Sequence, residues 1–487
     1  MSRLLAFLCL VLLLPAGVCR AAGGEGNTTT LWPVVDWRSS PSTDYAALHL
    51  FGPIVKWQKR GDEREVALRP LFYFSSAPDA TEGDILFPLL RTRSGRGYST
   101  LNSIDLFETE NRQAEVGGGE SFTLFPFLFY DRSDRGPSTL AVFPLGGRIF
   151  NHFNRDEIRF ALFPLYGQTR KGSTTVTNIL WPFFASIDGE NESGIKVWPL
   201  FGASGKPGVY RKRFYLWPLF FDYDLALDSD QPRKIRMFWP FYGIDSSPAQ
   251  TSRVVFWPFF SFRDDREKGY KKWDFPWPLW GVTRGASDYG NRFFPLFAYE
   301  RHSDSEKLWL AWPVYRYDRL DSPQLLRRRH SVLFFLYRDL HEAYPGEVGE
   351  RLHRVTLWPL FRYQQERGVT RFSLLALVEP IFPNSEGVEN NWAPLWRLYQ
   401  AEWDHHGNRV DSLLWNLFWR ERRPDAIAME LFPLFSLHRE ADGTTEFTLL
   451  KGLFRYHREE GEGRINLFYL PWGISWHISG AAATNRG

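Results

Sequence analysis

The feature that most constrains the fold of this 487-residue chain is a short aromatic-proline motif that returns along almost its whole length. We count about 24 copies, some of them degenerate, at a mean spacing of about 19 residues between Pro33 and Pro471. A period sustained for this long predicts one repetitive structure rather than several unrelated domains. Clear copies are LWPV at Trp32, LFPL at Phe163, LWPF at Trp181, LWPL at Trp217, FWPF at Trp239 and Trp257, and LWPL at Trp358.

Each motif lies within a stretch in which apolar residues alternate, which is the pattern of a β-strand. In RVVFWPFFSFRDD, from Arg253 to Asp265, the alternation runs through Pro258. Because proline cannot donate a hydrogen bond to a strand ladder, we expect it at matched bends or bulges in the centre of each strand. Polar segments rich in Gly, Asp, Asn and Ser separate the motifs and indicate turns. The sequence therefore predicts an all-β, antiparallel, up-and-down meander of about 24 strands.

Such a meander can close in several ways. The apolar face of each unit favours a large outer-membrane-type β-barrel, whose strands are about 9 to 11 residues long. A soluble repetitive β-shell, sandwich or propeller is the alternative, because it would bury apolar centres on both faces. A parallel β-solenoid is less favoured, because it would need apolar residues on every side of each coil, whereas these units contain charged turns. In the barrel, the aromatic residue that follows each motif would form girdles at both membrane interfaces, as at Tyr130, Phe262, Tyr299, Tyr317 and Tyr363.

The amino terminus has the layout of a secretory signal peptide, with Arg3, an apolar run and small residues before an expected cleavage after Ala21. Cleavage would remove both cysteines, Cys9 and Cys19, and with them any disulfide or thiolate metal site. Lipidation at Cys19 is the alternative. We divide the chain into a signal peptide (1–21), a short linker (22–30), a single β-repeat domain (31–478) and a carboxy-terminal tail (479–487).

Charge and motif content exclude several classes of function. After cleavage only one more basic than acidic side chain would remain, which argues against a nucleic-acid partner. No Gly-rich phosphate loop, GxSxG or HExxH motif occurs. The tandem tyrosine and charge pattern, as in YRYDRL from Tyr315, resembles that of YD-repeat shells but lacks their regular Gly-Arg register. We therefore assign no family and predict no enzyme.

Two polar clusters are candidate metal sites, and we interpret both as turns. In WDHHGN, Asp404 stands beside His405 and His406, which could share a metal only within a turn, so we interpret the segment as a polar hairpin cap. The second cluster, FDYDLALDSD from Phe221 to Asp230, could be a calcium-binding loop with oxygen ligands. It lacks the central Gly and the final Glu of an EF-hand loop, so we interpret it as a solvated turn. We predict no catalytic, cofactor-binding or metal-binding residues and no cofactor. The aspartates of the second cluster are Asp222, Asp224, Asp228 and Asp230.

The sequence predicts an exported, non-enzymatic protein of the cell envelope. The favoured role is an outer-membrane barrel for passage, export or assembly across the envelope. The alternative is a periplasmic or surface scaffold that presents a repetitive β-surface to partners or polysaccharide. The expected partners are the outer membrane or other envelope components, and the expected location is the cell outer membrane, with the periplasm or the extracellular surface as alternatives.

Overall fold

The computed structural model describes residues 27–40, 44–104, 107–112, 119–133, 136–346, 351–459, 461–470 and 472–477. In these residues 46 strands form one antiparallel sheet, in which each strand pairs with its neighbours along the chain. The prediction of an all-β antiparallel meander is therefore confirmed. The predicted signal peptide with Cys9 and Cys19, and the predicted tail, lie outside the described residues. No helix in the described ranges is long and apolar enough to cross a membrane.

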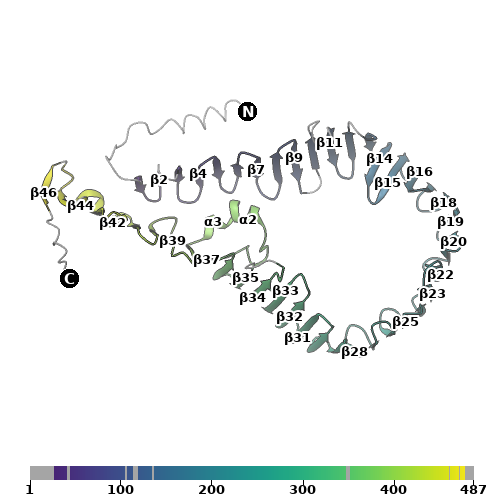
Figure 1. The fold of residues 1–487 in the computed structure, drawn as a ribbon. Coiled ribbons are helices and arrows are strands. Elements are labelled where there is room, and N and C mark those ends of the chain that lie inside the picture. The colour runs from purple at the N-terminus through teal and green to yellow at the C-terminus, as the bar shows by residue number, and fades with distance from the viewer. Residues whose placement is uncertain are drawn as a thin grey trace, which may run out of the picture.

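The sheet is a single curved band whose two ends return to each other (Figure 1). We call the first eight strands of the sheet, β1 to β8, the amino-terminal arm. Their bounds are β1 (Asn27–Leu31), β2 (Val35–Ser40), β3 (Tyr45–Leu50), β4 (Val55–Arg60), β5 (Glu63–Leu68), β6 (Phe72–Ser76), β7 (Ala80–Ile85) and β8 (Leu90–Gly95).

The middle of the band carries the chain away from this arm and back again (Figure 1). Its strands are β9 (Tyr98–Ser103), β10 (Phe107–Arg112), β11 (Gly119–Leu124), β12 (Leu128–Ser133), β13 (Thr139–Val142), β14 (Gly146–His152), β15 (Arg155–Ala161), β16 (Tyr166–Lys171), β17 (Thr174–Ile179), β18 (Phe184–Gly189), β19 (Glu192–Val197), β20 (Phe201–Lys206), β21 (Tyr210–Tyr215), β22 (Phe220–Leu225), β23 (Arg233–Phe238), β24 (Tyr242–Ser246), β25 (Gln250–Val255), β26 (Phe260–Asp265), β27 (Tyr270–Asp274), β28 (Trp280–Gly285), β29 (Tyr289–Phe293), β30 (Phe297–Arg301), β31 (Ser305–Leu310), β32 (Tyr315–Asp321), β33 (Leu326–Val332) and β34 (Tyr337–Ala343).

The remaining elements form the carboxy-terminal arm. They are β35 (Arg351–Leu357), β36 (Phe361–Glu366), β37 (Val369–Leu374), α2 (Glu386–Asn391), α3 (Ala393–Trp396), β38 (Tyr399–Asp404), β39 (Arg409–Leu413), β40 (Phe418–Arg422), β41 (Ile427–Leu431), β42 (Phe435–Arg439), β43 (Thr445–Leu449), the 3₁₀ turn η3 (Leu450–Gly452), β44 (Phe454–Glu459), β45 (Glu462–Leu467) and β46 (Gly473–His477).

The aromatic-proline motif lies in turns, which corrects its predicted place at strand centres. Trp358 and Pro359 connect β35 to β36, where Leu357 pairs directly with Phe361. Each repeat is therefore a hairpin of two short strands. This is why the sheet has 46 strands rather than the predicted 24 or so, and why a strand is four to seven residues long rather than about ten.

The physical reason for the error is the length of the turn. A three-residue turn places the flanking residues four apart, so alternation continues in phase from one strand into the next and resembles a single long strand. Val355 and Leu357 indeed share a face with Phe361 and Tyr363. The four-residue turn at Pro258 shifts the phase instead, because Val255 pairs with Phe260.

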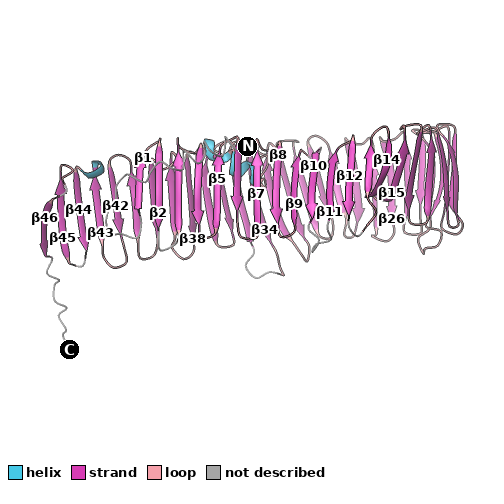
Figure 2. Ribbon diagram, turned by 90° about the horizontal axis from the view of Figure 1, so that it is seen from above, coloured by secondary structure: helices cyan, strands magenta, loops and turns pink. Residues whose placement is uncertain are grey.

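The predicted closure into a barrel is also corrected. In the described residues β1 pairs only with β2, and β46 pairs only with β45, so the two ends of the sheet share no ladder. Figure 2, turned by 90° from the view of Figure 1, shows nearly parallel strands between two rims.

The two arms meet face to face in a contact that we call the seam. In both arms the same face of the sheet points into the seam, with Asp36 on the amino-terminal arm and Trp419 on the carboxy-terminal arm. We call this the inner face. Trp37 and Phe418 lie on the opposite, outer face. Across the seam the Arg38 guanidinium lies 4.1 Å from the centre of the Trp419 ring, and Thr30 Oγ1 donates to Glu430 Oε2 at 3.2 Å.

The helices extend the seam. Asn391 Nδ2, fully buried in α2, donates to Asp84 Oδ2 at 3.1 Å, and Arg69 Nε donates to the Asn390 carbonyl at 2.7 Å. Trp392 Nε1 donates to the Phe87 carbonyl at 3.0 Å. Polar contacts of this kind, rather than shared strand pairing, join the two ends of the sheet.

The seam makes the protein sensitive to mild acid through His49 of β3. Burial lowers the pKa of His49 to about 4, and although Asp36 lies 3.8 Å away and opposes the shift, Lys56 and Arg38 add to it. Because the unfolded chain binds a proton near pH 6.5 and the folded chain does not, stability falls as pH drops from 6.5 towards 4. We expect a loss of about 2 kcal/mol over this interval, allowing for the partial exposure of the ring.

Denaturant unfolding at pH 7 and pH 5 measures this effect. His49→Gln removes the titrating group, so its unfolding free energy should change less between the two pH values than that of the unchanged chain. Equal pH dependence in the two proteins would contradict the assignment to His49.

Candidate functional site

One rim of the band consists almost entirely of apolar turns. Each turn joins the two strands of one hairpin, so the motif returns to the same side of the sheet at every repeat. Figure 2 shows this rim as the upper edge, where the helices also lie, and it runs nearly level along the band. We call it the apolar rim and define it by residues 32–34, 51–54, 69–71, 86–89, 125–127, 143–145, 162–165, 180–183, 198–200, 216–219, 239–241, 256–259, 275–279, 294–296, 311–314, 333–336, 358–360, 414–417, 432–434, 450–453 and 468–470.

Large side chains on the apolar rim are exposed. Trp257 keeps 52% of its surface accessible, Leu200 57% and Leu296 58%. A single exposed apolar side chain is common in a water-soluble protein, but a contiguous row of exposed apolar side chains marks an interaction surface. The rim is therefore the strongest candidate for a functional surface in the described residues.

In a representative turn of the apolar rim the backbone amides are paired within the protein. In the turn 180–183, the Leu180 and Trp181 amides donate to Leu165 and Pro164 carbonyls of the preceding rim turn, both at 2.8 Å. The Phe183 amide donates back to Leu180 at 2.8 Å, and Pro182 has no amide hydrogen. Every donor of this turn is paired, so its backbone can enter a low-dielectric environment without leaving a donor unsatisfied.

Aromatic rings connect one rim turn to the next. Phe163 lies 5.3 Å from Phe143 and 5.6 Å from Trp181, measured between ring centres. Trp198 and Trp217 are 5.5 Å apart in the same way. Aromatic pairs at such distances contribute about 0.5–1.5 kcal/mol each. The rings therefore stiffen the rim as well as making it apolar.

The few polar side chains of the apolar rim turn towards the seam. Arg69 donates to the Pro53 and Asn390 carbonyls, Asn416 Nδ2 donates to Asp36 Oδ2 at 2.7 Å, and Lys451 pairs with Glu430. Their charge and hydrogen-bonding capacity are thus used inside the protein. Of the two charged side chains in the turns that define the rim, Arg69 is buried, whereas Lys451 keeps part of its surface exposed while it pairs with Glu430.

The outer face adds an apolar row beside the rim. The five aromatic residues predicted to form two girdles lie instead in one row of cross-strand pairs, because every hairpin brings the motif back to the same side. Phe262 pairs with Arg253, Tyr317 with Leu308 and Tyr363 with Val355, while Tyr130 and Tyr299 occupy the equivalent place in β12 and β30.

The opposite rim is polar. Its connections are short turns such as Gly172–Ser173, where Gly172 has φ of 57°, the left-handed region that favours glycine. Ion pairs continue down the strands towards this rim, as between Arg233 and Asp245. The band is thus amphipathic from rim to rim.

The structure brings neither predicted polar cluster together as a metal site. Asp404 Oδ1 accepts from the His406 and Asn408 amides at 2.8 and 3.0 Å, which confirms the interpretation as a turn. His405 lies near the Gly368 carbonyl instead. The second cluster is divided: Asp222 and Asp224 lie in β22, where both pair with Arg236, and Asp228 and Asp230 lie in the exposed connection that follows.

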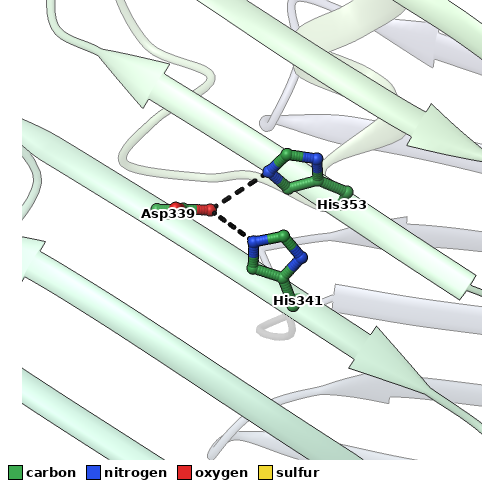
Figure 3. Close-up of side chains that lie close together, drawn as sticks. All are labelled: Asp339, His341 and His353. Atoms are coloured by element: carbon green, nitrogen blue, oxygen red, sulfur yellow. Dashed lines mark hydrogen bonds and ion pairs between the residues drawn. The ribbon is translucent and has the colours of Figure 1, made fainter.

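The residues that do converge were missed by sequence reasoning. Asp339, His341 and His353 lie on the outer face of β34 and β35, and one ligand atom from each lies within 4.8 Å of the others (Figure 3). We call them the His–Asp cluster. The only sequence signal is the spacing of Asp339 and His341, two residues apart on one strand and hence on one face. The third residue comes from a neighbouring strand, whose register the sequence does not reveal.

A scan against models of known protein families gave no match, and a search of curated proteins found none with significant similarity.

Proposed function

We propose that this protein is a non-enzymatic scaffold of the cell envelope that stands on a membrane surface with its apolar rim in the lipid interface. The observation that carries the proposal is the succession of exposed Trp, Phe and Leu turns along one level rim, interrupted in the described residues by the helical connection between β37 and β38. In this position the polar rim and most of both faces remain in water.

Three properties of the rim favour a lipid bilayer over a protein partner. Tryptophan and other aromatic side chains are enriched at membrane interfaces. The backbone amides of the turn 180–183 are paired internally, so this part of the rim can enter lipid without an unpaired donor. The same short apolar motif repeats along the rim, whereas protein interfaces depend on close complementarity at a few anchor residues.

The proposal keeps three expectations from the sequence: export, an envelope location and the absence of catalysis. It replaces passage across a membrane by attachment to its surface. Strands of four to seven residues are shorter than the 9 to 11 or so that a spanning strand requires. Each rim side chain whose remaining surface enters lipid would contribute on the order of 1 kcal/mol, so many weak contacts can give firm binding.

Flotation of the full chain with vesicles of phosphatidylethanolamine and phosphatidylglycerol tests the proposal. We expect the protein to float with the vesicles, and to remain with them in 1 M salt because the rim turns are apolar apart from the buried Arg69 and from Lys451, which is already paired with Glu430. Protein that stays at the bottom of the gradient with and without salt would overturn the proposal.

A further inference from the structure

The His–Asp cluster is built from two adjacent strands and lies away from both rims. Asp339 and His341 alternate along β34, and His341 pairs directly with His353 of β35. The two imidazole rings stack, with centres 3.9 Å apart and planes inclined by only 15°. Figure 3 shows both rings turned towards the same carboxylate.

The three donor atoms converge at distances that suit a metal ion. Nε2 of His341 and Nε2 of His353 each lie 3.2 Å from the same atom, Asp339 Oδ1. A zinc ion bonded at about 2.0–2.2 Å to nitrogen and carboxylate oxygen in tetrahedral geometry separates its ligand atoms by about 3.3–3.6 Å. The two nitrogen-to-oxygen distances are close to this range, and because the imidazoles are stacked, one ring must rotate for both Nε2 lone pairs to point at a shared ion.

A purely ionic pairing explains the arrangement less well. Two stacked imidazoles cannot both be protonated without repulsion, and one carboxylate can neutralise only one of them. Imidazole nitrogen and carboxylate oxygen are both ligands that first-row transition-metal ions bind.

The cluster is also accessible. The side chains of His341 and His353 keep 51% and 33% of their surface exposed, and that of Asp339 keeps 24%. A metal ion can reach it from solvent, and water can fill the remaining coordination positions. Gln365 of β36 pairs with His353 in the ladder and therefore lies on the same face as the cluster.

We propose that Asp339, His341 and His353 form a binding site for a divalent transition-metal ion of the zinc type, held by two imidazole nitrogens and one carboxylate oxygen. This ligand set suits zinc and its first-row neighbours rather than calcium or magnesium, which prefer oxygen ligands alone. The ion ties β34 to β35 on the outer face. The proposal does not depend on the membrane role.

Equilibrium dialysis of the full chain against Zn²⁺ tests the site. We expect one tightly held zinc ion per chain, and a loss of affinity of about 10-fold or more in His341→Ala and in His353→Ala. Asp339→Asn, which preserves side-chain shape, should lose affinity too and guards against an effect of misfolding. Bound Co²⁺ should show visible absorption bands that disappear in the same variants.

The other histidine pair supplies a matched control. His405→Ala with His406→Ala removes two adjacent imidazoles whose rings also lie 3.9 Å apart, but whose ligand atoms and those of Asp404 do not all lie within 4.8 Å of one another, and zinc affinity should be unchanged. Absence of a stoichiometric zinc ion, or equal loss in the control and in His341→Ala, would overturn the proposal.

Discussion

A chain in which Leu200, Phe259 and Leu296 are all replaced by aspartate will no longer float with lipid vesicles. These side chains lie in three separate turns of the apolar rim and are 57%, 50% and 58% exposed. Each substitution removes an apolar group from the interface and places a charge there. The combined effect of about 3–6 kcal/mol corresponds to at least about a 100-fold loss of vesicle affinity. Because the replaced groups are already exposed, the unfolding free energy should change little.

An equivalent triple substitution on the polar rim is the control for this result. Phe153, Leu227 and Tyr344 lie in connections on that side and are 60%, 41% and 39% exposed. Replacing them by aspartate adds the same charge and removes comparable apolar surface, and vesicle binding should be retained. If both triple variants lose binding equally, the attachment is a general property of charge rather than of the apolar rim.

Replacing Asp36 by alanine will loosen the contact between the two arms of the band. The Asp36 carboxylate is buried and accepts hydrogen bonds from Thr30 Oγ1 at 3.1 Å, Arg38 Nε at 3.2 Å and Asn416 Nδ2 at 2.7 Å. Without it, the Arg38 charge and two polar groups lose their partner in a buried contact, which costs about 3–5 kcal/mol. Of these three hydrogen bonds only the one from Asn416 crosses the seam, and no strand ladder joins the arms, so its loss should loosen the seam around β2 and β39. Small-angle scattering should record a larger radius of gyration.

Asp318→Ala distinguishes opening of the seam from simple destabilisation. Asp318 is buried to a similar degree and pairs with Arg316 and Arg329, but it lies in β32, in the middle of the band. Its loss should lower the unfolding free energy while the radius of gyration stays unchanged. An unchanged radius in Asp36→Ala as well would show that other contacts hold the seam.

The candidate surface was visible in the sequence, but its position was not. The repeating Trp, Pro, Phe and Leu residues were found from their spacing, and their apolar character was evident. The alternating pattern predicts these residues inside strands, because apolar residues before and after a three-residue turn lie on the same face of the sheet. Val355, Leu357, Phe361 and Tyr363 show this. An apolar centre that is buried in a strand becomes an exposed rim when the same residues form a turn.

The His–Asp cluster shows a second limit of prediction from the sequence. Asp339 and His341 share a face by simple alternation, which the sequence contains. His353 reaches them only through the pairing of β34 with β35, which depends on the length of the connection between the two strands. A cluster across two strands requires a register, and a register is a property of the folded sheet.

By itself the sequence determined the class of this fold, because a local pattern of short apolar alternation, proline and polar turns permits only strands joined by turns. It also determined the repeat and the polar character of the segments between the motifs. Only the tertiary structure decided that each repeat is a hairpin, that all the motifs lie on one rim, and that the ends meet in a seam. Those features depend on turn geometry and on contacts between residues hundreds of positions apart, such as Thr30 and Glu430, which no local pattern records.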